Sequence, residues 1–140
     1  MAPLRVVFDT NVFISTFILH GRSTRLAQVL FEGKFTLLVS EEILDEYFEV
    51  AIRPRFHSTP GEVKELLGRL VPWMHLVHDP RPIRVSRLRD PEDLMFLKCA
   101  ATGHAQFLVT GDKALLVLRR YRQVPIVSPR RFLQELGING

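Results

Sequence analysis

Four carboxylates occur in settings that ordinary surface acids do not usually occupy. Asp9 and Asp112 each follow a short apolar run, while Asp93 and Glu46 lie on or beside the apolar faces of predicted helices. An ionised carboxylate turned toward a core needs a hydrogen-bonding cap, an arginine or a metal ion. We therefore take these four acids as candidate catalytic and metal-binding residues.

The first candidate element is a helix that begins near residue 90 and carries Asp93. Asp90 suits the N-cap, Pro91 suits the first helical position, and Gly103 ends the helix. Asp93 then falls on the apolar face of this helix. Its neighbours on that face, three, four and seven residues on, are Phe96, Leu97 and Ala100.

Two short apolar runs, residues 4–8 and 105–110, are predicted to be buried strands. The first ends at Asp9, and the second ends at Thr110 and leads to Asp112. Ligands of open α/β sheets bind beyond the carboxyl ends of the strands, where both acids would lie. For Asp9 considered alone, a turn or N-cap is an equally ordinary role.

A helix from Ser40 to about Arg53 carries the fourth acid. Residues placed at about 100° steps put Glu46 next to the apolar arc of this helix, and Asp45 and Glu49 on its outer face. Glu46 either faces the site or borders the core and extends to solvent; this helix by itself does not decide between them. The arc consists of Ile43, Tyr47 and Val50.

Strands and helices alternate along the rest of the chain, which favours an α/β fold with a central, mainly parallel sheet and helices on both faces. The remaining predicted strands are residues 35–39, 74–77 and 124–127. The remaining predicted helices are residues 24–31, 59–71, 113–120 and 129–136, besides one that begins after Asp9.

Parallel strands bring Asp9, Asp112 and the start of the Ser40 helix to one edge of this sheet, and Asp93 reaches that edge from the first turn of its helix. Clustered carboxylates repel one another unless a cation neutralises them, and ligand sets of oxygen atoms select Mg²⁺ or Mn²⁺. Such ions activate water and stabilise a departing phosphate-ester oxygen. The arrangement suggests phosphodiester hydrolysis.

Composition fits one domain over residues 1–140, with 46% hydrophobic residues and no biased tract. The single Cys99 lies in an apolar helix, which favours a reduced thiol and a cytoplasmic location. The apolar residues 12–19 are too few to span a bilayer or to form a signal peptide. We expect no membrane association.

Of the 19 basic residues, 15 are arginine, and the net charge is +4. Arginine binds phosphates bidentately, so a polyanionic partner such as RNA is plausible, although Arg-rich surfaces also occur for reasons unrelated to ligands. The preferred phosphate-contacting segment is the stretch before Asp90, with a solvated loop as the alternative. Its basic residues are Arg81, Arg84, Arg87 and Arg89. Two further basic groups are the connector with Arg53, Arg55 and His57, which faces substrate or solvent, and the group Arg119, Arg120 and Arg122.

Four segments together carry a resemblance to a known family. They are VVFDTNVFIS (6–15), VSEEILDEY (39–47), DPEDLMFLKCA (90–100) and FLVTGDK (107–113). In this order and spacing the chain resembles a PIN-domain protein over essentially its full length. It is most similar to the small single-domain PIN proteins of bacteria and archaea that form the toxin component of toxin–antitoxin pairs.

The resemblance implies a three-layer α/β/α fold and an Mg²⁺- or Mn²⁺-dependent ribonuclease. Its acidic tetrad would be Asp9, Glu46, Asp93 and Asp112, with Asn11, Ser40 and Thr110 as polar supports. Two assignments stay open: Glu42, one turn before Glu46, is an alternative second acid, and Asp90 is an alternative metal ligand. The resemblance also implies a cognate antitoxin as partner, and a homodimer or higher oligomer.

Three other classes of protein were weighed against this one. A haloacid-dehalogenase-type phosphohydrolase needs a second Asp two residues after the first, where this chain has Asn11. A phospho-receiver domain needs paired acids after its first strand, which are missing. A non-catalytic RNA-binding or protein-interaction module stays open, because catalysis depends on fine geometry that sequence does not fix.

Overall fold

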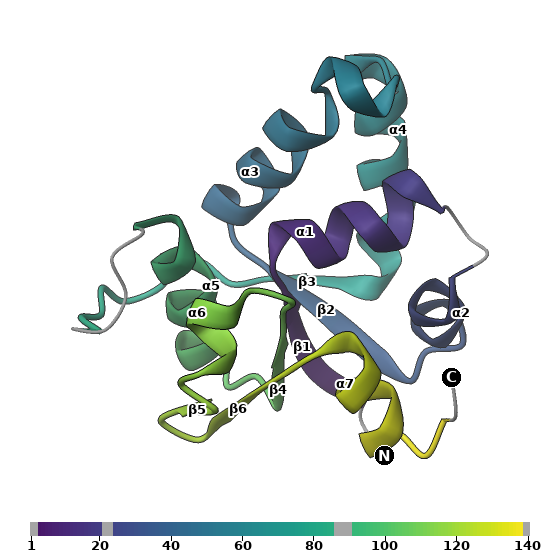
Figure 1. The fold of residues 1–140 in the computed structure, drawn as a ribbon. Coiled ribbons are helices and arrows are strands. Elements are labelled where there is room, and N and C mark those ends of the chain that lie inside the picture. The colour runs from purple at the N-terminus through teal and green to yellow at the C-terminus, as the bar shows by residue number, and fades with distance from the viewer. Residues whose placement is uncertain (1–2, 21–23, 86–90, 139–140) are drawn as a thin grey trace.

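The computed structural model describes residues 3–20, 24–85 and 91–138 (Figure 1). Its strands are β1 (Leu4–Phe8), β2 (Phe35–Val39), β3 (Met74–Leu76), β4 (Phe107–Val109), β5 (Arg120–Tyr121) and β6 (Val124–Val127). Its α-helices are α1 (Thr10–Phe13), α2 (Arg25–Phe31), α3 (Glu41–Ala51), α4 (Pro60–Leu70), α5 (Pro91–Thr102), α6 (Lys113–Leu116) and α7 (Pro129–Glu135). A π-helical segment, η1 (Ile14–Leu19), continues α1, and 3-10 turns form η3 (Pro54–Phe56) and η4 (Val71–Trp73).

The strands form one sheet in the order β3-β2-β1-β4-β6-β5. All neighbouring pairs are parallel except β5 with β6, which is antiparallel. In this register Val6 lies opposite Leu37 of β2, and Phe8 lies opposite Val109 of β4. The ends of β1 and β4 are therefore level with each other at the centre of the sheet. The predicted mainly parallel α/β fold is confirmed.

Helices cover both faces of the sheet, as two residues of β2 that point to opposite faces show. Phe35 packs edge-on against Phe132 of α7, with ring centroids 5.3 Å apart. Leu38, which points to the opposite face because it is three residues on, lies against Gly103 at the end of α5. Helices α5 and α7 therefore lie on opposite faces, as Figure 1 shows.

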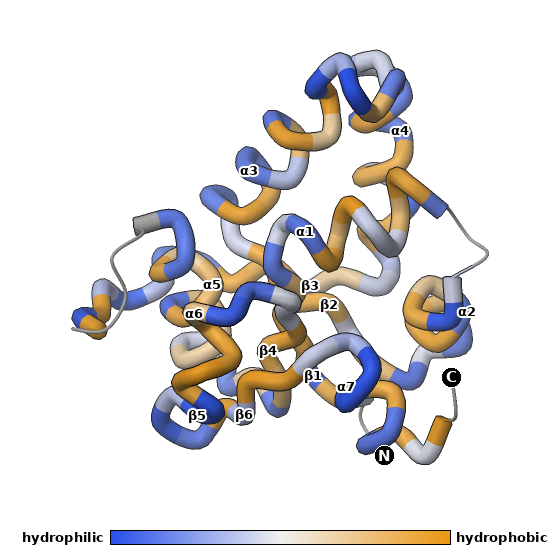
Figure 2. The backbone as a smooth tube through the Cα atoms, viewed as in Figure 1, coloured by the Kyte–Doolittle hydropathy of each residue, from blue (hydrophilic) through white to orange (hydrophobic). Residues whose placement is uncertain are grey.

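The central strand β1 lies in the core, where Val6, Val7 and Phe8 are fully buried. Hydrophobic residues follow the strands through the middle of the molecule, while hydrophilic residues concentrate on the outer turns of the helices (Figure 2). Burial of apolar surface of this kind is the main source of folding free energy. It fixes the strand ends that carry the candidate site.

Local capping sets where several helices begin. The side chains of Thr24, Ser40 and Ser128 each accept a hydrogen bond from a backbone N–H of the first helical turn. Thr59 and Glu62 form a reciprocal capping box at the start of α4. Asp90, the predicted cap of α5, lies outside the described residues.

The predicted helix over residues 113–120 is wrong in its second half. Helix α6 ends at Leu116, and residues 120–121 instead form β5, which pairs antiparallel with β6. The left-handed backbone of Arg119, with φ of 61°, turns the chain out of the helix. A second left-handed residue, Arg122, forms the hairpin turn between the two strands.

No helix of the described segments has both the length and the apolar character needed to cross a membrane.

Candidate active site

A pocket of about 200 Å³ lies at the carboxyl end of the central strands and is lined by acidic side chains. Figure 1 shows α1, α3, α5 and α6 beginning around this edge of the sheet. We call this pocket the carboxylate pocket, and the acids that line it are Asp9, Glu46, Glu92, Asp93 and Asp112. The structure thus brings together the four acids that the sequence singled out, from four separate segments.

Asp9 follows β1 directly and is the most enclosed of these acids, with 5% of its surface exposed. Its Oδ1 accepts a hydrogen bond of 2.9 Å from the backbone N–H of Val12, which makes it the N-cap of α1. Its Oδ2 accepts a hydrogen bond from the hydroxyl of Thr110. Burial raises the pKa of Asp9, these two hydrogen bonds lower it, and the negative charge of Asp112 raises it.

Thr110 connects the two carboxylates that follow the central strands. It is fully buried after β4, and its hydroxyl donates to Asp9 while accepting a hydrogen bond of 2.9 Å from the backbone N–H of Asp112. Asp112 in turn caps α6, because its Oδ1 accepts from the backbone N–H of Ala114 at 3.0 Å. A single buried hydroxyl therefore fixes the position of one acid and the backbone of the other.

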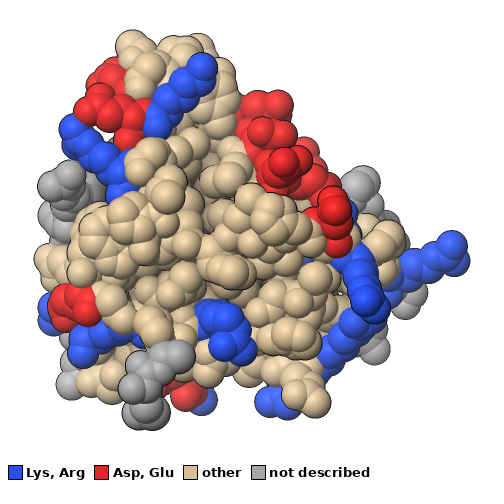
Figure 3. Space-filling model, turned by 180° about the vertical axis from the view of Figure 1, so that it is seen from behind, with Lys and Arg blue, Asp and Glu red and all other residues tan. Residues whose placement is uncertain are grey.

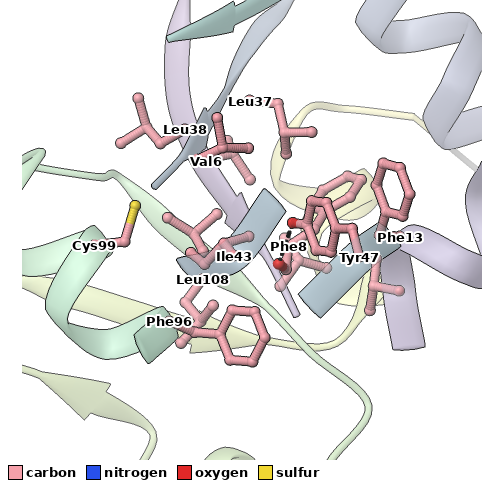
Figure 4. Close-up of a cluster of buried hydrophobic side chains, with 14 of the residues drawn as sticks. Val6, Phe8, Phe13, Leu37, Leu38, Ile43, Tyr47, Phe96, Cys99 and Leu108 are labelled. Carbon is pink, nitrogen blue, oxygen red and sulfur yellow. Dashed lines mark hydrogen bonds between the residues drawn. The ribbon is translucent and has the colours of Figure 1, made fainter. Parts of the chain in front are cut away.

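Glu46 enters the pocket from α3, which a buried hydrogen bond joins to the end of β1. Tyr47, the next residue, is fully buried, and its hydroxyl donates a 2.6 Å hydrogen bond to the carbonyl oxygen of Phe8. Its ring stacks on Phe13 with centroids 4.0 Å apart (Figure 4). Glu46 is partly buried, whereas Asp45 on the outer face is exposed. The side of α3 predicted for Glu46 is therefore correct.

Asp93 reaches the pocket from the first turn of α5. It is partly buried, and Phe96, one turn further along, lines the same pocket. The apolar stripe predicted beside Asp93 is confirmed, since Phe96, Leu97 and Ala100 are all buried. The packing of this stripe therefore turns Asp93 toward the end of the sheet.

Several other predicted site residues lie elsewhere. Ser40 caps α3 and, like Glu42, lines a different pocket, while Glu42 forms an ion pair of 2.7 Å with Lys98. Arg81 and Arg84 are exposed and do not line the carboxylate pocket. Asn11, in contrast, is exposed and lines the carboxylate pocket. The predicted residues Arg87, Arg89 and Asp90 lie outside the described residues.

Sequence analysis missed two lining residues and left a third undecided. Glu92 is not among the predicted site residues, although an acid beside Asp93 in the same helical turn is an available signal. Thr10, directly after Asp9, is also absent from the prediction. Arg53 was placed in a connector that faces either substrate or solvent, and the structure puts it at the pocket.

The donors that line this pocket fit a hard divalent cation. Among the described residues Asp9 accepts hydrogen bonds from Val12 and Thr110, and a carboxylate has about four lone-pair sites, so its oxygens can accept further partners. Thr10 Oγ1, in the same lining, is buried without a hydrogen-bond partner among the described residues. Oxygen donors of these kinds are the ligands that Mg²⁺ and Mn²⁺ prefer. Within the described segments, no three Asp, Glu, His or Cys side chains are close enough to enclose an ion by themselves.

Comparison with known proteins gives a consistent result. A family model for the PIN domain matches residues 5–114. An uncharacterized protein of Methanocaldococcus jannaschii, MJ1680, is 28% identical to this chain, over 94% of this chain and 91% of its own length. The PIN domain of T. brucei RRP44 superposes with a TM-score of 0.51 at 13% identity, over 98% of this chain and 82% of that domain.

The matched residues begin in β1 and end in α6, so they include every segment that contributes to the carboxylate pocket. PIN domains are generally nucleases that use divalent metal ions. Because the match spans most of the sequence and the fold agrees with a PIN-domain structure, this chain belongs to the PIN-domain family.

Proposed function

We propose that this protein is an Mg²⁺- or Mn²⁺-dependent endoribonuclease. The observation that carries this proposal is that four carboxylates from four separate segments line one pocket at the end of a PIN-domain sheet. Among the described residues that line the pocket there is no Ser, Cys, Lys or His. Carboxylates are the groups that hold hard cations and accept a proton from water, so hydrolysis by an activated water is the route we propose.

The four predicted acids have separate roles in this proposal. Asp9, Asp93 and Asp112 would hold the ion, directly or through water, and Glu46 would orient the attacking water and accept its proton. A bound Mg²⁺ or Mn²⁺ would supply Lewis-acid stabilisation of the charge that develops on the phosphate. The water oxygen bonds to phosphorus, the P–O3′ bond breaks, and the 3′ oxygen takes up a proton. The products would carry 5′-phosphate and 3′-hydroxyl ends.

RNA would be attracted by arginines outside the carboxylate pocket. Arg81 and Arg84 are exposed, and the backbone N–H of Arg81 donates to Thr102 Oγ1 at 3.0 Å, which joins this segment to the end of α5. Arg87 and Arg89 extend the same basic stretch of the sequence. Contacts to phosphates would make binding weaken as salt rises and would act on all sequences alike.

The biological setting we propose is that of the toxin in a toxin–antitoxin pair. The resemblance to small prokaryotic PIN proteins supports a cognate antitoxin as partner, a homodimer or higher oligomer, and a cytoplasmic location. In this setting, expression of the wild-type protein arrests growth and expression of the Asp93→Asn variant does not. A wild-type protein that cuts RNA but leaves growth unchanged would favour a role outside toxin–antitoxin systems.

The decisive experiment is RNA cleavage by matched variants. A panel of single-stranded and structured RNAs is incubated with Mg²⁺, with Mn²⁺ or with EDTA. We expect cleavage by the wild type to need the ion and to fall about 10²- to 10⁴-fold in Asp93→Asn and Glu46→Gln. Glu42→Gln is the matched control, because Glu42 lies one turn from Glu46 on α3 but outside the pocket.

The outcomes separate the two functions under consideration. Metal-dependent cleavage that the pocket variants lose supports the nuclease. RNA that is bound but never cut under any metal condition would instead support a non-catalytic RNA-binding module.

A further inference from the structure

Arg53 is a cationic side chain at the carboxylate pocket, and helix geometry explains why it lies there. Glu46, Val50 and Arg53 follow one another at intervals of four and three residues along α3 and its end, and all three line the pocket. Residues at this spacing share one face of a helix. This face of α3 therefore presents a carboxylate, and the residue just beyond its C-cap presents a guanidinium to the same pocket.

The backbone holds Arg53 in a defined position. Its N–H donates to the carbonyl oxygen of Val50 at 3.1 Å, and its own carbonyl accepts from the N–H of Phe56 at 3.0 Å. It leaves α3 in an extended conformation, with φ of −61° and ψ of 141°, and Pro54 follows as the first residue of η3. Proline has a fixed φ, so the start of η3 is stiff. The direction in which Arg53 leaves the backbone is thus set by its neighbours.

The guanidinium of Arg53 is not used in the ion pairs of the described residues. Those pairs join Arg69 to Glu65, Lys98 to Glu42, and Arg131 to Glu135. Arg53 is exposed although five acids line the same pocket. A guanidinium has five N–H donors in a planar fork that matches two oxygens of one phosphate group. These donors are available to a ligand that enters the pocket.

The surroundings favour a phosphate as that ligand. The outer face of α3 is acidic, and Figure 3 shows the run of acidic side chains on this flank of the molecule. Its exposed acids are Glu41, Glu42, Asp45 and Glu49. A phosphodiester that approaches the carboxylates is repelled both by them and by this flank. A cation placed within the pocket lining reduces that repulsion where the phosphate must lie.

We propose that Arg53 is a substrate-binding catalytic residue, whose guanidinium donates to the non-bridging oxygens of the phosphate that is cleaved. This inference rests on the proposed nuclease function and deepens it. Negative charge builds on those oxygens as water attacks phosphorus, so donors aimed at them stabilise the transition state more than the bound substrate. Arg53 therefore acts on both the affinity and the rate.

The first test compares Arg53→Gln, Arg53→Lys and Arg55→Gln in single-turnover cleavage of RNA. Arg55 is the matched control, since it lies two residues away and its guanidinium packs over the ring of Phe56 at 4.7 Å. We expect Arg53→Gln to slow cleavage by about 10²- to 10³-fold, Arg53→Lys to restore part of the rate, and Arg55→Gln to remain within about twofold of the wild type. Thermal unfolding of each variant establishes that it is folded.

The second test separates phosphate contact from a structural role. After the cleaved linkage has been mapped with the wild type, binding is measured to RNA that carries a neutral methylphosphonate at that linkage and to unmodified RNA. We expect Arg53→Gln to weaken binding of unmodified RNA roughly tenfold and to leave binding of the modified RNA at the wild-type value. Equal weakening on both RNAs would overturn the proposal, as would an Arg53→Gln variant that cleaves like Arg55→Gln.

Failure of this inference differs from failure of the nuclease proposal. A wild type that cleaves RNA while Arg53→Gln cleaves it equally fast overturns the role of Arg53 alone. A wild type that cleaves no RNA with either ion overturns both. The same panel with a DNA strand of identical sequence shows whether the phosphate contact serves RNA only.

Discussion

The hydroxyl of Tyr47 on α3 donates a 2.6 Å hydrogen bond to the carbonyl oxygen of Phe8, the last residue of β1. Phe8 is followed directly by Asp9, and Tyr47 is preceded directly by Glu46. One buried hydrogen bond thus joins the backbone beside one candidate acid to the side chain beside another. The distance between the two acids depends on a contact that neither acid makes.

Replacing Tyr47 with Phe should therefore affect both stability and activity. The carbonyl of Phe8 loses its buried donor, which costs about 1–3 kcal/mol of the free energy of unfolding. The stacking on Phe13 is retained, so the loss reports the hydroxyl and not the ring. Urea unfolding measures the first effect and RNA cleavage the second. Unchanged stability would mean that water or another donor replaces the hydroxyl.

Replacing Thr110 with Val should destabilise the protein in a pH-dependent way in the absence of metal. The hydroxyl of Thr110 favours ionised Asp9 and so lowers its pKa, against the larger effect of burial. The free energy of unfolding of the variant is therefore lowered most, by about 1–3 kcal/mol, at pH values where Asp9 is ionised. As the pH falls through the pKa of Asp9, this part of the loss should disappear.

Thr110→Ser keeps the hydroxyl and is the control for that experiment. Unfolding in urea with EDTA is measured at pH 7 and near pH 3 for all three proteins. A Thr110→Val deficit of the same size at both pH values would contradict the role assigned to ionised Asp9.

Alkaline conditions should destabilise the protein through Cys99. Burial raises the pKa of this thiol to about 12, from an ordinary value of 9.0. Because the folded pKa lies above the unfolded one, stability is fully present below pH 9 and is lost as the pH rises toward 12. The free energy of unfolding should fall by up to about 1.4 kcal/mol per pH unit in that window from this group.

Cys99→Ala tests this assignment, because it removes the thiol and leaves the other ionisable groups in place. Its unfolding free energy should decline less steeply than that of the wild type between pH 9 and pH 11. Tyr47, whose pKa is also raised by burial, contributes above pH 10 in both proteins. Parallel pH profiles of the wild type and Cys99→Ala would show that the thiol is not the group responsible.

Two glycines should respond in opposite directions to substitution by alanine. A Cβ at Gly103 would lie 2.8 Å from Val77 Cγ2 and 2.9 Å from Leu38 Cδ1, so Gly103→Ala forces the end of α5 away from the sheet. We expect a loss of about 1–3 kcal/mol. Gly68, inside α4, has open space at this position, and Gly68→Ala should gain about 0.5–1 kcal/mol. Thermal melts of both variants measure the contrast.

Divalent ions should raise the melting temperature, and EDTA should reverse the effect. The charge of Asp112 already raises the pKa of Asp9, a sign of repulsion between carboxylates that a cation would relieve. At about 100 times its Kd, an ion that binds only the folded state adds about 2.7 kcal/mol. Asp93→Asn should shrink the shift and Glu42→Gln should keep it. An equal shift in both would place ion binding outside the pocket.

The sequence was most informative where chemistry and local structure coincide. Asp9, Thr110 and Asp112 follow apolar strands, so their meeting at one edge follows from the parallel order alone. The side of α3 that carries Glu46 follows from helical periodicity, although the approach of that helix to β1 does not. That approach depends on the pair of Tyr47 and Phe8, which are 39 residues apart.

Other features depend on tertiary geometry that the sequence does not show. Arg53 lines the pocket because the chain leaves the end of α3 on the side that carries Glu46 and Val50. Residues 115–118 are apolar enough to continue a helix, yet the chain leaves it through left-handed Arg119 to pair β5 with β6. In that segment tertiary pairing overrides local propensity, which is weak over so few residues.

The two edge strands of the sheet, β3 and β5, are short. β3 has three residues and β5 has two, and among the inner strands only β4 is as short as β3. The unpaired backbone of an edge strand is a template on which another molecule can add a strand, and this is a route to fibrils and precipitation. Here the five-residue strands β1 and β2 lie between these short edge strands. The arrangement of the sheet therefore guards its apolar central strands against aggregation, whatever reaction the pocket performs.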